Sequence, residues 1–213
     1  MRRSYGIDAG YINYLKSLGC VLYLPLGKND YHDYIGGRDL SLTGSGSLVF
    51  DDTMNAMLLS TPSSYPTVVA TLDSLLPTSD WSANVVSGCA VVRRGVTSYQ
   101  NKGAELFCVG NTNNCLYPSL WVNGTSSNMS YWDNNFHDVG IVFSGSGRTW
   151  YQDGTVSRTD TYGGRAPSSW GQNKDWFIST WASSNTSANL YISNIMLFNK
   201  ALSLADYRKI QRY

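Results

Sequence analysis

Residues 136–158, FHDVGIVFSGSGRTWYQDGTVSR, contain three runs of strand length separated by two turn sequences. The runs at 138–143 and 149–152 are rich in β-branched and aromatic residues, which favour strands. The dipeptide Asp153-Gly154 separates the second run from the third, at 156–158. It suits a type I′ turn, in which both central residues need φ > 0. This segment therefore predicts three strands joined by tight hairpins.

Strand signals of the same kind recur on both sides of this segment. Upstream they fall at 21–26, 39–42, 47–50, 57–60, 67–72, 89–93, 105–109 and 116–122, and downstream at 176–181 and 190–198. About eleven or twelve short strands with no long helix between them are typical of a two-sheet antiparallel sandwich or jelly roll. The chain is therefore predicted to be all-β.

Short helices are expected at both ends of the chain. Residues 8–19 place apolar side chains on one helical face, with Asp8 as N-cap and Gly19 as C-terminal stop. Near the other end, Ser203 and Asp206 form a start similar to a capping box, for a helix that runs to about residue 210. We expect a helical extension at 1–19 and one sandwich domain at 20–213 that ends in this helix.

The composition excludes several classes of function. The 213 residues carry a formal net charge of +1 and only 15% charged side chains, so a nucleic-acid partner is not expected. No apolar run approaches the roughly 20 residues of a membrane span. Fourteen of the fifteen acidic residues are Asp, and Glu105 is the one Glu. Few Glu and Lys with abundant Gly, Ser, Asn and Tyr fit strands and turns better than long helices.

The N-terminal residues and the cysteines bear on where the protein works. No apolar segment follows Arg2 and Arg3, so no signal peptide is expected. The four cysteines form no CxxC pair, which argues against structural zinc. We expect reduced thiols, and a disulfide between Cys108 and Cys115 across a hairpin remains an alternative.

Three stretches together resemble the concanavalin A-like lectin/glucanase superfamily, in particular its laminin-G-like modules. They are VLYLPLG at 21–27, FHDVGIVF followed by the Asp153-Gly154 hairpin, and LYISNIMLFNKALS at 190–203. The resemblance implies a jelly-roll sandwich of two sheets with six or seven strands each and one concave face. It also implies a structural role for His137, at the start of a strand. The fold alone does not fix a function, because this superfamily contains lectins, glycosidases, adhesion modules and structural proteins.

The chemistry of the superfamily's hydrolases is not expected here. A retaining glycosidase needs two carboxyl groups about 5–5.5 Å apart. In the family these are glutamates on alternate positions of one strand, but the only glutamate here is Glu105. The aspartate pairs Asp30/Asp33 and Asp51/Asp52 lie in turn-forming segments, where Asp is common for backbone reasons.

Histidine chemistry gives no stronger signal. Each of the two histidines is followed by an aspartate, as His32-Asp33 and His137-Asp138. Neighbouring residues of a strand point to opposite faces, so neither pair forms a relay by itself. The sequence therefore predicts a protein that is not an enzyme.

Binding sites are predicted by residue type alone. Aromatic side chains beside polar loops suit sugar rings, and the candidates are Tyr131, Trp132, Trp170 and Trp181. Asp and Asn oxygens in loops suit calcium, and the candidates are Asp51, Asp52, Asp133 and Asn134.

We expect a binding or structural module on the surface of a virion, most naturally a bacteriophage. It would be made in the host cytoplasm and would contact other virion proteins, surface glycans or copies of itself. Its place would be a capsid decoration, head fibre or tail fibre. Two alternatives stay open: a free-standing extracellular lectin that uses calcium or aromatic side chains, and a glycosidase that uses aspartates.

Overall fold

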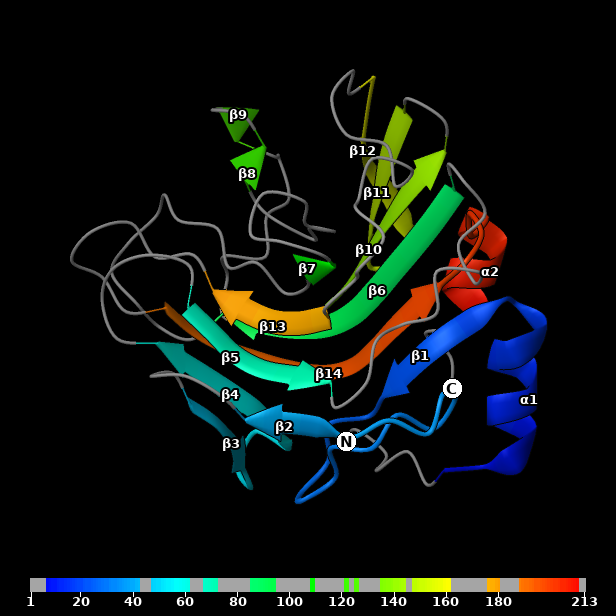
Figure 1. The fold of residues 1–213 in the computed structure, drawn as a ribbon. Helices are drawn as coiled ribbons and strands as arrows, with labels where there is room; N and C mark the ends of the chain where they lie inside the picture. The colour runs from blue at the N-terminus through cyan, green and yellow to red at the C-terminus, as the bar shows by residue number, and fades with distance from the viewer. Residues whose placement is uncertain are drawn as a thin grey trace.

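A computed structural model of the chain describes residues 7–42, 47–61, 67–72, 85–94, 108–109, 121–122, 125–126, 135–144, 147–161, 176–180 and 188–210. Two antiparallel sheets face each other, and of the two short helices α1 lies beside strand β1 and α2 near the end of β14 (Figure 1). The predicted fold class, a mostly β protein with two antiparallel sheets and a helix near each end, is confirmed.

The larger sheet has the strand order β12-β11-β10-β6-β14-β4-β3, and β1 also pairs with β14. Its strands are β1 (Cys20–Leu24), β3 (Ser47–Asp51), β4 (Ala56–Thr61), β6 (Val85–Arg94), β10 (His137–Ser144), β11 (Gly147–Gln152), β12 (Thr155–Thr161) and β14 (Ala188–Phe198). The smaller sheet has the order β2-β5-β13-β7, built from β2 (Leu40–Leu42), β5 (Thr67–Leu72), β7 (Cys108–Val109) and β13 (Trp176–Thr180). A further pair consists of β8 (Trp121–Val122) and β9 (Thr125–Ser126).

The sizes of the sheets differ from those that the family resemblance implied. Within the described ranges the sheets contain eight and four strands, instead of six or seven each. The predicted strands at 105–109 and 116–122 are described only at Cys108–Val109 and Trp121–Val122. Strand β9 was not expected, because its two residues give too short a pattern to detect.

The three strands predicted at residues 138–158 form as expected. Strands β10, β11 and β12 pair in succession. Between β11 and β12, Asp153 has φ 48° and Gly154 has φ 77°. Both values lie in the left-handed region that a type I′ turn needs, so the predicted turn is confirmed.

Both predicted helices are present with the expected caps. Helix α1 (Ala9–Ser17) begins where the Asp8 carboxylate accepts the Gly10 amide N–H at 2.8 Å. It ends before Gly19, whose φ of 79° suits a glycine. Helix α2 (Leu204–Ile210) begins with a reciprocal pair, since the Ser203 hydroxyl accepts the Asp206 amide and donates to its carboxylate.

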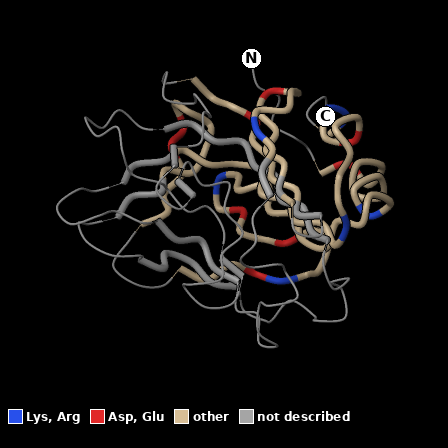
Figure 2. Tube along the Cα trace, turned by 90° about the horizontal axis from the view of Figure 1, so that it is seen from above, with Lys and Arg blue, Asp and Glu red and all other residues tan. Residues whose placement is uncertain are grey.

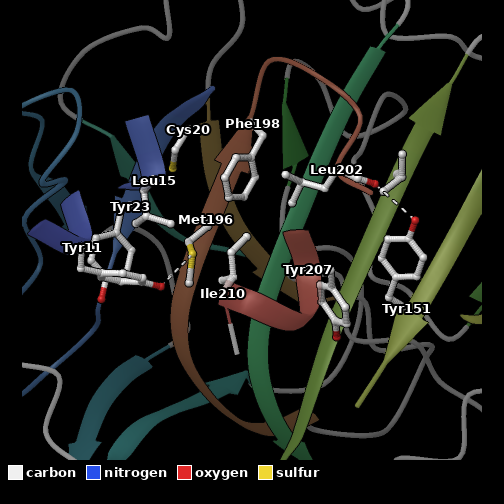
Figure 3. Close-up of a cluster of buried hydrophobic side chains, with 11 residues drawn as sticks. Tyr11, Leu15, Cys20, Tyr23, Tyr151, Met196, Phe198, Leu202, Tyr207 and Ile210 are labelled. Atoms are coloured by element: carbon white, nitrogen blue, oxygen red, sulfur yellow. Dashed lines mark hydrogen bonds between the residues drawn. The ribbon is translucent and has the colours of Figure 1, made fainter. Parts of the chain in front are cut away.

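One face of the larger sheet, which we call the outer face, is covered by both helices. Tyr11 and Leu15 of α1 and Tyr207 and Ile210 of α2 are buried against side chains of β1, β10, β11 and β14 (Figure 3). The Tyr151 hydroxyl donates to the carbonyl of Leu202 at 3.2 Å, which connects β11 to the start of α2. The helices therefore share one apolar cluster, and this cluster joins both ends of the described chain.

Side chains on the opposite face of the larger sheet form the interior of the sandwich. Ile141 on β10 and Trp150 on β11 are neighbours in the register and are almost fully buried. Ile192 on β14 and Met57 on β4 are also paired and buried. Every residue of β1 is buried.

Cys20 is a buried free cysteine in the cluster under the helices. Burial strongly raises the pKa of its thiol, so it remains protonated and unreactive. Cys115, the other half of the proposed hairpin disulfide, lies outside the described residues.

Basic and acidic positions are interspersed along the described parts of the trace (Figure 2). Neither described helix has the length and apolar character of a membrane span.

Candidate ligand-binding loop between strands β1 and β2

Six of the eight residues proposed from the sequence as binding residues lie outside the described part of the chain. They are Tyr131, Trp132, Asp133, Asn134, Trp170 and Trp181. Their roles in sugar or calcium binding therefore stay predictions, and the two remaining candidates are Asp51 and Asp52.

Asp51 ends strand β3 and closes the turn to β4. One oxygen of its carboxylate accepts the amide N–H groups of Thr53 and Met54, at 2.9 and 3.0 Å, and the other accepts the Tyr191 hydroxyl at 3.0 Å. Hydrogen bonds, the largest from the Met54 amide, lower the pKa of Asp51. One oxygen of Asp51 thus closes the turn and the other connects it to Tyr191 of β14, which is a sufficient structural reason for this residue.

Asp52 points to a different partner. Its carboxylate pairs with the ammonium group of Lys28 at 2.8 Å, which connects the β3–β4 turn to the loop between β1 and β2. No group of three or more acidic, histidine or cysteine side chains in the described residues has the geometry to hold a metal ion. The calcium site stays a prediction that rests partly on Asp133 and Asn134.

The loop between β1 and β2, residues 25–39, is organised around a buried ion pair. The Asp33 carboxylate is fully buried and accepts the Arg38 guanidinium at 2.8 Å. It also accepts the amide N–H groups of Tyr23 and Ile35, each at 3.0 Å. Arg38 donates in addition to the carbonyl of Val21 at 3.3 Å. The pair therefore fastens the loop to the first strand of the larger sheet.

Two glycines shape the loop around this ion pair, since Gly36 leaves room for it and Gly37 allows the left-handed turn beside it. A Cβ atom on Gly36 would lie 1.9 Å from Arg38 Nη1 and 2.5 Å from an Asp33 oxygen. Gly37 has φ 69°, and its amide donates to the carbonyl of Asp33 at 2.9 Å. The sequence DYIGGRD at 33–39 thus forms a tight turn that encloses the Asp33–Arg38 ion pair.

The same loop holds two aromatic rings and two carboxylates, of which Tyr34 is half-buried and packs partly against the apolar cluster under the helices. The His32 and Tyr34 rings meet edge to face, with centroids 4.9 Å apart. His32 Nδ1 lies 2.7 Å from an Asp39 oxygen, and the Tyr34 hydroxyl donates to both oxygens of Asp30 at 3.2 and 3.3 Å. The His32 side chain is 43% exposed and that of Asp39 is 68% exposed. We call these four residues the loop cluster.

The electrostatics of the loop cluster keep its hydrogen-bond roles fixed. Partial burial, and then the charge and hydrogen bond of Asp30, raise the pKa of Tyr34, so its hydroxyl remains a donor near neutral pH. The bond from His32 Nδ1 to Asp39 directs the other ring nitrogen, Nε2, away from that carboxylate. The cluster therefore offers two carboxylate acceptors beside two aromatic rings, the His32 imidazole and the Tyr34 phenol, and such groups suit hydroxylated ligands.

Sequence reasoning found only part of this cluster. It considered Asp30 and His32 for catalysis and did not consider Tyr34 or Asp39 as partners. The missing signal is the backbone bridge between His32 and Asp39, which brings residues seven apart face to face. Local spacing gives no hint of such a bridge inside a loop.

His137 has the structural role that the family resemblance implied. Its Nδ1 lies 2.6 Å from Asp153, and it is nearly buried at the start of β10. The partner is thus a turn residue 16 positions along the chain, and the adjacent Asp138 instead donates its amide to Asp153. The expectation that an adjacent His-Asp pair forms no relay agrees with these contacts.

No protein-family model matches the chain, and no curated protein sequence matches it. Solved structures with a similar fold include the binding domain of botulinum neurotoxin serotype D/C, with TM-score 0.63 and 15% identity over 91% of this chain. Another is the binding domain of botulinum neurotoxin DC in complex with rat synaptotagmin II, with TM-score 0.60 and 13% identity over 91% of this chain. A third similar structure is of botulinum neurotoxin type C, whose cell entry is described as dependent upon interaction with two ganglioside molecules. Its TM-score is 0.60, with 15% identity over 96% of this chain.

These likenesses establish the fold and nothing more. The chain spans only about half the length of those structures, 52%, 52% and 53% respectively. The three structures agree with a β-sandwich fold for this chain. They do not assign the chain to a family.

Proposed function

We propose that this chain is a non-catalytic glycan-binding module of the concanavalin A-like type. The observation that carries the proposal is the loop cluster, in which the His32 and Tyr34 rings lie between the Asp30 and Asp39 carboxylates on a loop fixed by a buried ion pair. A rigid loop loses little conformational entropy on binding, so its contacts contribute more fully to affinity. The similar sandwich of the botulinum neurotoxin binding domain supports a binding function without catalysis.

The positions of the aspartates support binding rather than hydrolysis. Asp33 is fully buried beneath the loop, so it is not available to a substrate as the partner of Asp30. Asp51 is occupied by two amides and a tyrosine hydroxyl, and Asp52 by Lys28. These contacts give Asp33, Asp51 and Asp52 structural roles, which leaves Asp30 without a second carboxylate from either pair.

The test is a glycan array with the wild-type chain and two variants, His32→Ala and Tyr34→Ala. Each variant is expected to weaken binding about tenfold, which corresponds to roughly 1.4 kcal/mol. Thr159→Ala, a change at an exposed position of β12, is the matched control and should bind as the wild type does. Circular dichroism verifies that each variant folds. Wild-type affinity in both loop variants, or no binding of the wild type to any glycan, would contradict the proposal.

Two further assays test the two alternative functions that the sequence left open, a glycosidase and a calcium-dependent lectin. Reducing-sugar release from β-glucans should stay at background for the wild type, whereas release abolished by Asp51→Asn would indicate an aspartate-dependent glycosidase. Binding should persist in EDTA, because the loop cluster uses protein groups alone. Loss of binding in EDTA would instead favour the calcium site predicted at Asp51, Asp52, Asp133 and Asn134.

We also propose that the module acts on the surface of a virion, in contact with other virion proteins or with copies of itself. The low content of charged residues and the abundance of Gly, Ser, Asn and Tyr support such a structural context. Cofractionation with purified particles and light scattering of the isolated chain test this proposal. A monomer that never sediments with particles would contradict it.

A further inference from the structure

The charges of the β1–β2 loop do not balance once its ion pairs are counted. Residues 25–39 contain two basic side chains, Lys28 and Arg38, and three acidic ones. Arg38 is neutralised by the buried Asp33, and Lys28 is neutralised by Asp52 from the neighbouring turn. With histidine counted as neutral, the loop surface keeps the two negative charges of Asp30 and Asp39.

These two carboxylates flank the aromatic part of the loop cluster. Asp30 holds the hydroxyl of Tyr34, and Asp39 holds Nδ1 of His32, so each lies beside one ring of the edge-to-face pair. Among the described residues, Oδ2 of Asp39 accepts no hydrogen bond, and this side chain is 68% exposed. An ionised carboxylate only accepts hydrogen bonds, and it forms strong ones with hydroxyl donors.

We propose that the loop cluster selects uncharged sugars and rejects sugars that carry a carboxylate or a sulfate. This inference rests on the proposed glycan-binding function and adds the class of ligand. A neutral sugar hydroxyl donates to Asp39 or Asp30, while the ring C–H groups lie against His32 or Tyr34. An anionic substituent in the same place meets two like charges and no free cation of the loop.

The size of this discrimination follows from simple electrostatics. Two unit charges at roughly 8 Å in water, each acting on one anionic substituent, weaken binding about fivefold in total. Salt screens such an effect, because the Debye length falls to about 3 Å at 1 M. The penalty for an anionic sugar is therefore expected at low salt and should largely vanish at high salt, while neutral sugars are insensitive.

The experiment uses matched pairs of printed oligosaccharides, each neutral glycan beside the same glycan capped with sialic acid or sulfate. The wild-type chain and the variants Asp30→Asn and Asp39→Asn are compared at 50 mM and 1 M NaCl. The asparagine variants keep the size of the side chain and remove its charge. Asp8→Asn is the matched control, because it removes an exposed carboxylate outside the β1–β2 loop, and asparagine caps helix α1 as well as aspartate does.

Four results are distinguishable. A preference of about fivefold for neutral members at 50 mM that shrinks at 1 M and in both loop variants supports the inference. Equal or better binding of capped glycans by the wild type overturns it and leaves the proposed function standing. A neutral preference that Asp30→Asn and Asp39→Asn leave unchanged also overturns it, since other residues then discriminate. Failure of the wild type to bind any glycan overturns the proposed function itself.

Discussion

At the scale of single residues, Asp33 and Arg38 hold the loop in place at an energetic cost. Both side chains are buried, and taking two charges out of water costs several kcal/mol per ion unless their bonds are complete. Here Asp33 accepts two backbone amides as well as the guanidinium, which completes its hydrogen bonds. The pair therefore acts chiefly to specify one conformation of the loop.

Removing one partner of this pair should be costly. Arg38→Met keeps much of the side-chain volume but leaves the Asp33 carboxylate buried without its cation, and we expect a loss of about 3–5 kcal/mol in the free energy of unfolding. The same replacement at the exposed pair, Lys28→Met, should cost no more than about 1 kcal/mol. Urea denaturation measures both. Equal losses in the two variants would mean that the buried pair does not determine the stability of the loop.

Asp51 gives a prediction about pH. Its folded-state pKa is lower than its ordinary value of 3.8, so the ionised form favours the folded state. This contribution is complete above about pH 4 and is lost as the pH falls through the folded-state pKa. The stability difference between wild type and Asp51→Asn should therefore be constant from pH 5 to 7 and shrink below pH 4. Thermal melts across this range measure it, and a difference that grows on acidification would contradict the assignment.

At the scale of elements, the sequence was a good guide wherever the deciding contacts are local. The helix at 9–17 follows from Asp8, its apolar face and Gly19, and the helix at 204–210 follows from Ser203 and Asp206. The β11–β12 hairpin follows from Asp153-Gly154. In each case the deciding residues lie within the element or next to it, so the local pattern was enough.

The β11–β12 turn is directly testable. Gly154 has φ 77°, where a Cβ atom is unfavourable, and its carbonyl accepts the Arg208 side chain at 2.6 Å. Gly154→Ala should lower the free energy of unfolding by about 1–2 kcal/mol, through backbone strain alone. Thr159→Ala on the same hairpin should change it by less than about 0.5 kcal/mol. Guanidinium titrations compare the two, and an unchanged midpoint for Gly154→Ala would show that the turn adapts without strain.

At the scale of the whole molecule, local patterns no longer suffice. Strand β14 pairs with β1, β4 and β6, which come from three distant parts of the chain, and no spacing rule predicts that order. The loop cluster depends on the same kind of contact, because the loop is fastened to β1 through Tyr23 and Val21. The sequence therefore predicted the class of fold, but not the order of the strands or the contacts that assemble the loop cluster.

The packing of α1 leads to the last prediction. The sequence suggested a helical extension at 1–19 ahead of the sandwich, yet Leu15 is fully buried in the cluster that also contains Ile210 of α2. If the helix and the sandwich form one cooperative unit, Leu15→Ala should lower the free energy of unfolding by about 2–5 kcal/mol. Lys16→Ala, on the exposed side of the same helix, should change it by less than about 0.5 kcal/mol. Circular dichroism and tryptophan fluorescence should report one shared transition for Leu15→Ala. A fluorescence transition that stays at the wild-type midpoint would show instead that the helix is an independent extension, released without loss of the sandwich.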